Sequence, residues 1–350
     1  MIKLRHDVAR VGVLIATKDG ESTIADTIRS VAGQADVYVV SDGSTDATAR
    51  VALDAGARVF ALAKNVGKPA AIYRAVKALQ LTKAYDLLAI LDDDTIVAPN
   101  FIEEARKSMK PGVAIVVGRT ITRWGDDRPW NVWLGCRAYA YWRYQLTIRR
   151  AQSAFNVLNC ISGSNSVYRS ELLDQVLVER TPYIVDDTYW TLETHRRKLG
   201  RIVYAPRAHA FVQDPTTFGA WYKQNLRWMW GTFQGIWGHR CGRKASRFDF
   251  AYLLLMLDWF FYVLGGPLVL GLVLVGIWWN PFWLLIGTFL GYFVWTIPAA
   301  IAIKKWRLVF MTPAFIAIDW LYRLVFLHAF LKTIRRPSVQ SCRWESPPRY

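Results

Sequence analysis

Charged residues are almost missing from one long stretch of this sequence. They make up 20% of the whole chain, yet only Asp258 is charged across residues 250–303. A helix that crosses the core of a bilayer needs about 20 predominantly apolar residues. The stretch is long enough for two such helices, which we predict at about 250–278 and 281–303, with a turn at Asn280 between them.

A third apolar segment, 308–331, contains Asp319 and Arg323 and predicts either a third crossing or a helix that lies in the membrane interface. Basic residues precede the first crossing and follow the second, and the tail beyond residue 331 is also basic. By the positive-inside rule these clusters are cytoplasmic. We therefore expect an integral membrane protein with two crossings plus an interfacial helix, and with its N-terminal 240 residues and its C-terminal tail in the cytoplasm.

Cysteine is scarce, and several nucleotide-binding motifs are missing. The four cysteines are widely spaced without a CxxC pair, so neither a zinc site nor a disulfide framework is indicated. No GxGxxG follows the first predicted strand and no GxxxxGK[ST] occurs, which argues against a dinucleotide fold and excludes a P-loop. The net charge of +17 lies largely beside the apolar segments, so we expect a lipid bilayer and no nucleic acid as a partner.

Short β-branched runs alternate with helical stretches in the N-terminal part of the chain. We predict strands at 11–17, 36–42, 58–62 and 86–92, and helices near 21–32, at 45–55, after Pro69 and from Pro99. This alternation is typical of an α/β fold with a mostly parallel sheet and helices on both faces. Ligands of such sheets bind beyond the carboxyl ends of the strands. Thr17, Asp42 and Asp92 end their strands, so we expect them on one rim.

Three consecutive carboxylates, Asp92, Asp93 and Asp94, follow the fourth predicted strand. Unpaired buried carboxylates are costly, and hard divalent ions take oxygen ligands and bridge to phosphate oxygens. Strand alternation directs Asp92 and Asp94 to one side and Asp93 to the other. We therefore predict that the first and third share a metal ion and that Asp93 is structural. A capping and surface cluster is the alternative.

Three further stretches have both a functional and an ordinary structural interpretation. Asp42, in SDGSTDAT at 41–48, either belongs to a turn and helix cap or accepts a hydrogen bond from a base or ribose. Lys68 lies just before a helix, where it either binds a phosphate or is an exposed loop lysine. Asp186 and Asp187 open a helix, where they either cap it or provide a general base.

The stretch 218–237 predicts an amphipathic helix at the membrane interface. Gln224, Arg227 and Trp228 share one face of it, where the guanidinium suits a diphosphate and the indole suits the apolar face of a sugar. An ordinary aromatic-rich interface helix is the alternative. A second interfacial helix is predicted at 130–148, where Arg137 interrupts the apolar stripe. The predicted apolar stripe of the first helix consists of Phe218, Tyr222, Leu226, Met229, Phe233 and Ile236.

Taken together, these motifs resemble the inverting family 2 glycosyltransferases, and more narrowly their membrane-embedded branch, which includes cellulose, chitin and hyaluronan synthases. The resemblance covers about residues 11–231. Its motifs occur in the family's order: SDGSTD, NVGK, the DxD-type DDD, SGSNSVYR, the acidic pair and QNLRW as the QxxRW motif. Two motifs depart from the family's pattern. PxYNE is replaced by TKDGE after the first strand, and TED by VDD at 185–187.

The resemblance implies a GT-A-like fold and a donor side built from the strand-end residues. Asp42 would contact the uridine and Lys68 the diphosphate, with Thr17 also on the donor side. Asp92 and Asp94 match the outer positions of the DxD motif. Asp94 is implied as the direct ligand of Mg²⁺ or Mn²⁺, with Asp92 close by and also on the donor side.

The acceptor side follows from the later motifs. Asp187 matches the acid of the TED motif, which implies that it is the general base. Arg227 would lie at the diphosphate of the donor. Trp228, Gln224 and Asp186 would contact the acceptor.

We therefore expect a metal-dependent, inverting glycosyltransferase that moves a sugar from a nucleotide-sugar, with a UDP-sugar as the expected donor, to an acceptor hydroxyl, and that could extend a polysaccharide. Single-sugar transfer to a lipid carrier or a protein is one alternative, and a catalytically silent membrane subunit for sugar binding or transport is another. The sequence leaves the oligomeric state open. The expected organisation is a cytoplasmic GT-A-like domain (1–215), an interfacial helix with the QxxRW motif (216–248), transmembrane or interfacial helices (249–333) and a basic cytoplasmic tail (334–350).

Overall fold

The computed structural model describes residues 9–276 and 280–338, and the chain divides into two compact units. The sheet unit contains residues 9–121 and 149–213, together with Ser338. The helical unit contains residues 122–148 and 214–337, apart from 277–279. The predicted basic tail reaches to residue 350, and its part from 339 onward lies outside the described residues.

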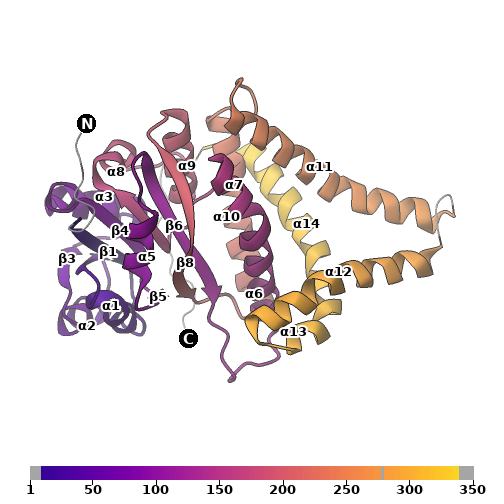
Figure 1. The fold of residues 1–350 in the computed structure, drawn as a ribbon, viewed down its shortest axis with the longest axis horizontal. Coiled ribbons are helices and arrows are strands. Elements are labelled where there is room, and N and C mark those ends of the chain that lie inside the picture. Colours follow the sequence, from indigo (N-terminus) through magenta and orange to yellow (C-terminus); the bar gives the residue numbers. More distant parts are fainter. Residues whose placement is uncertain (1–8, 277–279, 339–350) are drawn as a thin grey trace. The chain divides into compact units, whose positions relative to one another are not determined.

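The sheet unit has, in the described part of the chain, eight strands in the order β3-β2-β1-β4-β7-β6-β8-β5 (Figure 1). The first four strands to occur in the chain are parallel neighbours, and the helices between them follow the predicted alternation. These elements are β1 (Val11–Thr17), α1 (Ile24–Ala32), β2 (Asp36–Asp42), α2 (Thr48–Asp54), β3 (Arg58–Leu62), α3 (Lys68–Ala78), α4 (Leu81–Ala84), β4 (Leu87–Asp92) and α5 (Phe101–Ser108).

The rest of the sheet is antiparallel where its pairing is defined, so the expectation of a mostly parallel sheet is wrong beyond β4. Strand β7 runs antiparallel to both β4 and β6, and β5 runs antiparallel to β8. Antiparallel neighbours do not need a helical crossover on one face. The alternation of strands and helices in the first part of the chain therefore could not predict the antiparallel strands that follow. The elements are β5 (Ile96–Val97), β6 (Val113–Thr122), α7 (Arg150–Phe155), β7 (Asn165–Arg169), α8 (Ser170–Val176), α9 (Asp186–Arg196) and β8 (Arg201–Val212).

Both faces of the sheet are covered by helices, which explains why the strands are almost continuously apolar. Ile15 of β1 belongs to one buried cluster, together with Ile28 of α1. The next residue toward the N-terminus, Leu14, belongs to a second cluster, together with Ile72 of α3. The predicted helices on both faces are therefore confirmed.

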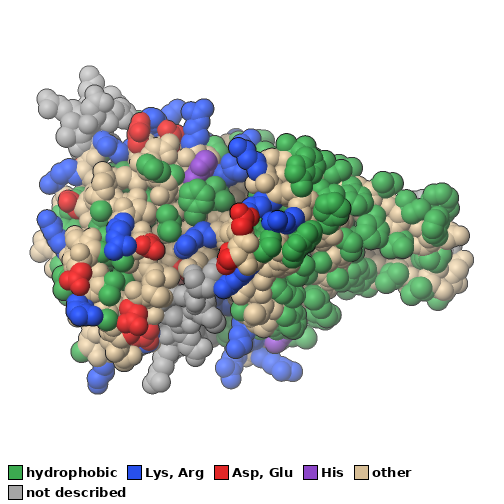
Figure 2. All heavy atoms as spheres, turned by 90° about the horizontal axis from the view of Figure 1, so that it is seen from below, with side chains coloured by type: hydrophobic (Ala, Val, Ile, Leu, Met, Phe, Trp, Pro, Cys, Tyr) green, Lys and Arg blue, Asp and Glu red, His purple; other side chains and the backbone are tan. Residues whose placement is uncertain are grey.

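The helical unit contains, among the described residues, three helices long and apolar enough to cross a membrane: α11, α12 and α14. The ranges of α11 and α12 match the two predicted crossings. Many large hydrophobic side chains of these two helices are exposed, and Figure 2 shows the hydrophobic surface of this part of the chain. Helix α14 meets the same criteria, so its length and composition do not support the preference for an interfacial helix there. The elements of this unit are α6 (Val132–Tyr144), a π-helical turn (Gln145–Arg149), α10 (Phe218–Gly238), α11 (Arg247–Leu274), α12 (Pro281–Ile303), α13 (Arg307–Phe310) and α14 (Thr312–Arg335).

The predicted apolar stripe of α10 packs in large part on α14. The ring of Phe233 lies 5.1 Å from that of Phe326 and 5.6 Å from that of Phe330, between centroids. At the other end of the stripe, the hydroxyl of Tyr222 lies 2.8 Å from Nδ1 of His328. Protein therefore covers much of the surface that the sequence assigns to the membrane interface, and an interfacial position of α10 stays a prediction.

Candidate active site

The polar residues at the ends of β1, β2 and β4 lie at one edge of the sheet, as the parallel strands require. In the register of the sheet, Thr17 of β1 is opposite Ser41 of β2, and Ala16 is opposite Asp92 of β4. Asp42 ends the neighbouring strand β2. The three predicted strand-end residues therefore share one rim.

Asp42 is fully buried and fixes the loop that leads into α3. Its carboxylate accepts hydrogen bonds from the N–H groups of Val66, at 2.8 Å, and Gly67, at 2.9 Å. Burial raises the pKa of Asp42, and the two N–H donors oppose that rise. Gly43 has a φ of +63°, and a Cβ there would clash with the backbone nitrogen of Asn65, so only glycine allows this approach. Contact of Asp42 with a base or ribose stays a prediction.

Lys68, the first residue of α3, is the positive partner of the acidic turn. Its ammonium donates to the carboxylate of Asp92. Burial lowers the pKa of Lys68, but the carboxylates of Asp92, Asp186 and Asp187 raise it, and the net effect is an increase above its ordinary value. The lysine is therefore a permanent cation that these acids share.

The three consecutive aspartates differ in exposure, but strand alternation is not the cause, because β4 ends at Asp92 and both Asp93 and Asp94 lie in the turn that follows. Asp92 and Asp94 are partly exposed, whereas Asp93 is 3% exposed. The Asp93 carboxylate accepts a hydrogen bond from the hydroxyl of Thr17, and its backbone carbonyl accepts one from the hydroxyl of Thr27, at 2.9 Å. The structure thus gives Asp93 the structural contacts expected of it. Thr17 is fully buried, which gives no support to a direct contact with the donor.

Asp187 lies in the first turn of α9 and faces the loop that contains Gly163. Its Oδ2 accepts a hydrogen bond from the N–H of Gly163, at 3.1 Å, and the thiol of Cys160 lies 3.8 Å from its Oδ1. Burial and the neighbouring carboxylate of Asp186 raise the pKa of Asp187 to about 7, against the lowering effect of Lys68. A carboxyl group with such a pKa is suited to accept a proton near neutral pH.

Gly163 is the point where the lysine and this acid approach each other. A Cβ on this residue would lie 3.3 Å from Nζ of Lys68 and 3.5 Å from Oδ2 of Asp187. Asp186 begins α9 beside them, and its buried Oδ2 has no hydrogen-bond partner among the described residues. Unsatisfied buried oxygens are costly, so this atom lacks the partner that such an oxygen normally has in a folded protein.

Metal binding has to be judged from the carboxylates present. Across residues 9–276 and 280–338, no group of three His, Cys, Asp or Glu side chains could hold a metal ion by itself. Mg²⁺ is usually bound by one or two carboxylates together with water and substrate phosphates. The partly exposed Asp92 and Asp94 fit that mode, in which the substrate completes the coordination.

Gln224, Arg227 and Trp228 lie on α10, in the helical unit, so their relation to Asp187 stays a prediction. Oε1 of Gln224 accepts a hydrogen bond from Nη2 of Arg137, at 2.7 Å. The guanidinium carbon of Arg137 lies 4.8 Å from the centroid of the Trp228 ring. Arg227 is exposed.

The burial of Arg137 was not predicted. We expected this residue to interrupt the apolar stripe of an interfacial helix, whereas the structure buries it on α6 beside Asp214. A charge within an aromatic-rich helix, followed by an acid at the start of the DPTTFGAWYKQNLRW stretch, was the available signal. This signal does not indicate that the two residues contact each other, because they are far apart in the sequence.

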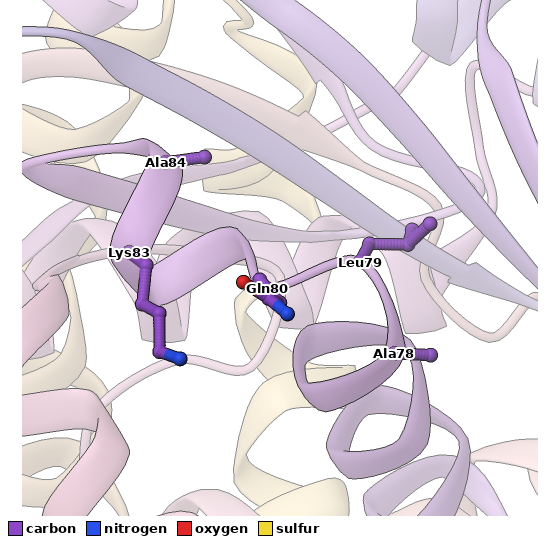
Figure 3. A pocket seen from close by; sticks show the side chains of 5 residues that line it. All are labelled: Ala78, Leu79, Gln80, Lys83 and Ala84. Carbon is purple, nitrogen blue, oxygen red and sulfur yellow. The ribbon is translucent and has the colours of Figure 1, made fainter.

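One surface hollow lies elsewhere and takes no part in this site. Figure 3 shows it at the turn between α3 and α4, lined by Ala78, Leu79, Gln80, Lys83 and Ala84. Lys68 begins α3, whereas the hollow is at the C-terminal end of that helix. It is therefore separated from the strand-end rim by the length of α3.

The profile of the family described as "Glycosyltransferase like family 2" matches residues 9–231. A poly-beta-1,6-N-acetyl-D-glucosamine synthase from Staphylococcus epidermidis is 27% identical over 244 residues, which are 66% of this chain and 57% of that protein. An N-acetylglucosaminyltransferase from Mesorhizobium japonicum is 29% identical over 232 residues, which are 61% of this chain and 53% of that protein. This chain thus spans little more than half the length of these relatives.

Among solved structures, a mannosyltransferase from Pyrobaculum calidifontis, in complex with GDP-Man and Mn²⁺, has a similar fold. The TM-score is 0.61 at 15% sequence identity, and the match covers 93% of this chain and 87% of the other. This likeness confirms the predicted GT-A-like fold with C-terminal helices.

Proposed function

This chain belongs to the glycosyltransferase-like family 2, and we propose that it is a membrane-bound enzyme that transfers a sugar from a nucleotide-sugar to an acceptor hydroxyl. The observation that carries the proposal is the approach of Lys68 and Asp187 on either side of Gly163. A permanent cation and a carboxyl group with a pKa of about 7 are thus held together at the edge where the parallel strands end. That pair matches what displacement of a diphosphate by a hydroxyl requires.

In the proposed reaction Asp187 removes the proton of the acceptor hydroxyl. The hydroxyl oxygen forms a bond to the anomeric carbon of the donor sugar, on the side opposite the diphosphate. The bond from that carbon to the diphosphate oxygen breaks, and the nucleoside diphosphate leaves with the electron pair. A single displacement of this kind inverts the anomeric configuration. Lys68 supplies positive charge where the diphosphate develops negative charge.

Asp94, with Asp92 beside it, would hold Mg²⁺ or Mn²⁺. When bound, such an ion neutralises the charge on the departing diphosphate. The Mn²⁺ in the complex of the mannosyltransferase with the similar fold supports the use of a divalent ion. Asp42 would contact the base or ribose of the donor, and its backbone partners in the loop before α3 already hold it in place.

The helical unit would supply the acceptor side and the membrane attachment. Arg227 would bind the diphosphate, and the indole of Trp228 would stack on the acceptor sugar. Basic residues flank the helices that could cross a membrane, which supports a cytoplasmic position for the sheet unit.

The relatives support a particular first donor and product. One is named as a synthase of a poly-N-acetylglucosamine and the other as an N-acetylglucosaminyltransferase. We therefore propose UDP-N-acetylglucosamine as the donor and extension of a polysaccharide as the outcome. The GDP-Man in the complex with the similar fold is a reason to test GDP-mannose as well.

The test is release of nucleoside diphosphate by the detergent-purified full chain. The donors are UDP-N-acetylglucosamine, UDP-glucose, UDP-glucuronic acid and GDP-mannose, each with Mg²⁺, Mn²⁺ or EDTA. We expect metal-dependent release from one UDP-sugar, and activity that survives EDTA would contradict the metal site. No release from any donor would favour the catalytically silent subunit, and gel analysis of product length separates polymer extension from transfer of a single sugar.

A further inference from the structure

Arg137 of α6 is a buried cation with an acidic partner from a distant part of the chain. Its side chain is 8% exposed, and its Nε lies 3.3 Å from Oδ1 of Asp214, whose side chain is 1% exposed. Asp214 also accepts a hydrogen bond from the hydroxyl of Tyr141, at 3.3 Å. Nε of Arg137 makes no hydrogen bond among the described residues, so this pair anchors the guanidinium by its charge and proximity.

The same guanidinium contacts α10 at the residues of the QNLRW motif. Its Nη2 donates to Oε1 of Gln224, at 2.7 Å, and both Nη1 and Nη2 lie 3.4 Å from Oδ1 of Asn225. Its carbon centre lies 4.8 Å from the centroid of the Trp228 ring. One buried arginine thus holds an amide and covers an indole that are four residues apart on a single helix face.

These contacts leave Trp228 partly exposed, with the guanidinium over its ring. A planar guanidinium can stack on a ring while it donates from its edges, which a lysine ammonium cannot do. The orientation of the indole, and of the Gln224 amide beside it, therefore depends on an arginine at position 137.

We propose that Arg137, anchored by Asp214, is a positioning residue for the acceptor sugar. It holds the Gln224 amide and backs the Trp228 ring, so that the remaining surface of the indole is presented to the acceptor. This inference rests on the proposed function, because it assigns Gln224 and Trp228 to the acceptor. Arg137 itself touches neither donor nor acceptor.

A matched control lies on the same helix. Arg143 of α6 also stacks on a tryptophan, with its guanidinium carbon 5.2 Å from the ring centroid of Trp295, but that ring belongs to α12. Arg143→Lys therefore removes an arginine–tryptophan contact from α6 without touching the QNLRW motif.

The experiment uses the full chain in detergent and measures two reactions. One is hydrolysis of the donor without acceptor. The other is elongation of whichever tetrasaccharide of N-acetylglucosamine, glucose or mannose the wild type uses. For Arg137→Lys we expect the acceptor KM to rise about tenfold, the size expected from loss of one charge-assisted hydrogen bond. The donor KM and the rate of hydrolysis should stay within about twofold of wild type. Arg143→Lys should leave all three quantities unchanged.

Arg137→Lys leaves the Asp214 charge in place, and a lysine that fits poorly could prevent folding. The double variant Arg137→Gln/Asp214→Asn removes both charges together, so no unpaired buried charge remains. We expect the same increase in acceptor KM from it. A wild-type acceptor KM in either variant, or an equal loss of donor hydrolysis and elongation, would overturn the inference.

Failure of the proposed function gives a different result. In that case the wild type neither hydrolyses a donor nor elongates a tetrasaccharide, and the inference falls with it. An active wild type whose acceptor KM does not depend on Arg137 refutes the inference alone.

Discussion

The ionisation of Asp187 gives the proposed reaction a pH dependence that one neighbouring charge should shift. Burial and the carboxylate of Asp186 raise the pKa of Asp187 to about 7, while the ammonium of Lys68 opposes the rise. A general base acts only when it is deprotonated, so kcat/KM should increase as the pH rises through this pKa. Asp186→Asn removes one of the two main causes of the increase. It should therefore move the rising limb to lower pH.

The magnitude follows from the size of the shift. A change from 3.8 to about 7 is roughly three pKa units, or about 4 kcal/mol in favour of the neutral carboxyl group. With a pKa of about 7, roughly 1% of Asp187 is ionised at pH 5 and about half at pH 7, so kcat/KM should rise roughly fiftyfold over that interval. Two charges about 6 Å apart interact by about 3 kcal/mol at an effective dielectric constant of about 20. Asp186→Asn should thus lower the midpoint by about one to two pH units.

The assay measures kcat/KM for the donor from pH 4.5 to pH 9, with release of nucleoside diphosphate as the signal. Glu193→Gln is the control, because Glu193 lies on the same helix, α9, and is not among the causes of the Asp187 shift. An Asp186→Asn profile with the wild-type midpoint, or with a higher one, would refute the assignment of this limb to Asp187. A shift of equal size in Glu193→Gln would refute it too.

Asp94→Asn should reduce metal-dependent release more than tenfold, whereas Asp93→Asn should mainly lower the Tm, by the equivalent of about 1–3 kcal/mol, because it weakens a buried hydrogen bond to a carboxylate; equal loss of activity in both variants would contradict the separate roles of these two side chains. Lys68→Met should raise the donor KM and move the pH midpoint above about 7, since the ammonium holds the pKa of Asp187 down; a midpoint that falls would contradict this. The pKa of Asp187 is higher in the folded protein than in the unfolded chain, so the wild type loses stability as the pH rises from 3.8 to about 7. Asp187→Asn removes this loss, so it should raise the Tm more at pH 8 than at pH 4. Thermal unfolding of both proteins at the two pH values tests this difference.

The strand ends and the acidic pair were predictable because they depend on local signals. Runs of β-branched residues end at Thr17, Asp42 and Asp92, and parallel pairing brings such ends to one edge of a sheet. The start of α9 at Asp186 follows from the preference for acids in the first turn of a helix. The burial of Asp93 matches the prediction from strand alternation, but the structure places Asp93 and Asp94 in a turn after β4, so this pattern has another cause.

What was not predictable depends on contacts between distant residues. The approach of Lys68 to Asp187 requires the loop at Gly163 to lie between them, and nothing near any of these residues encodes it. The burial of Arg137 depends on Asp214, which comes from another part of the chain. A helical stripe indicates that one face is covered, but not whether lipid or another helix covers it.

The central claim is that Asp187 is the base of a sugar transfer in the sheet unit. The most direct measurement is the single-turnover rate of transfer from the active donor to the acceptor, compared between the wild type and Asp187→Asn at pH 8, with folding checked by thermal unfolding. We expect the rate to be reduced by roughly 10²–10⁴-fold in a folded variant. A folded Asp187→Asn that transfers sugar at close to the wild-type rate would contradict it.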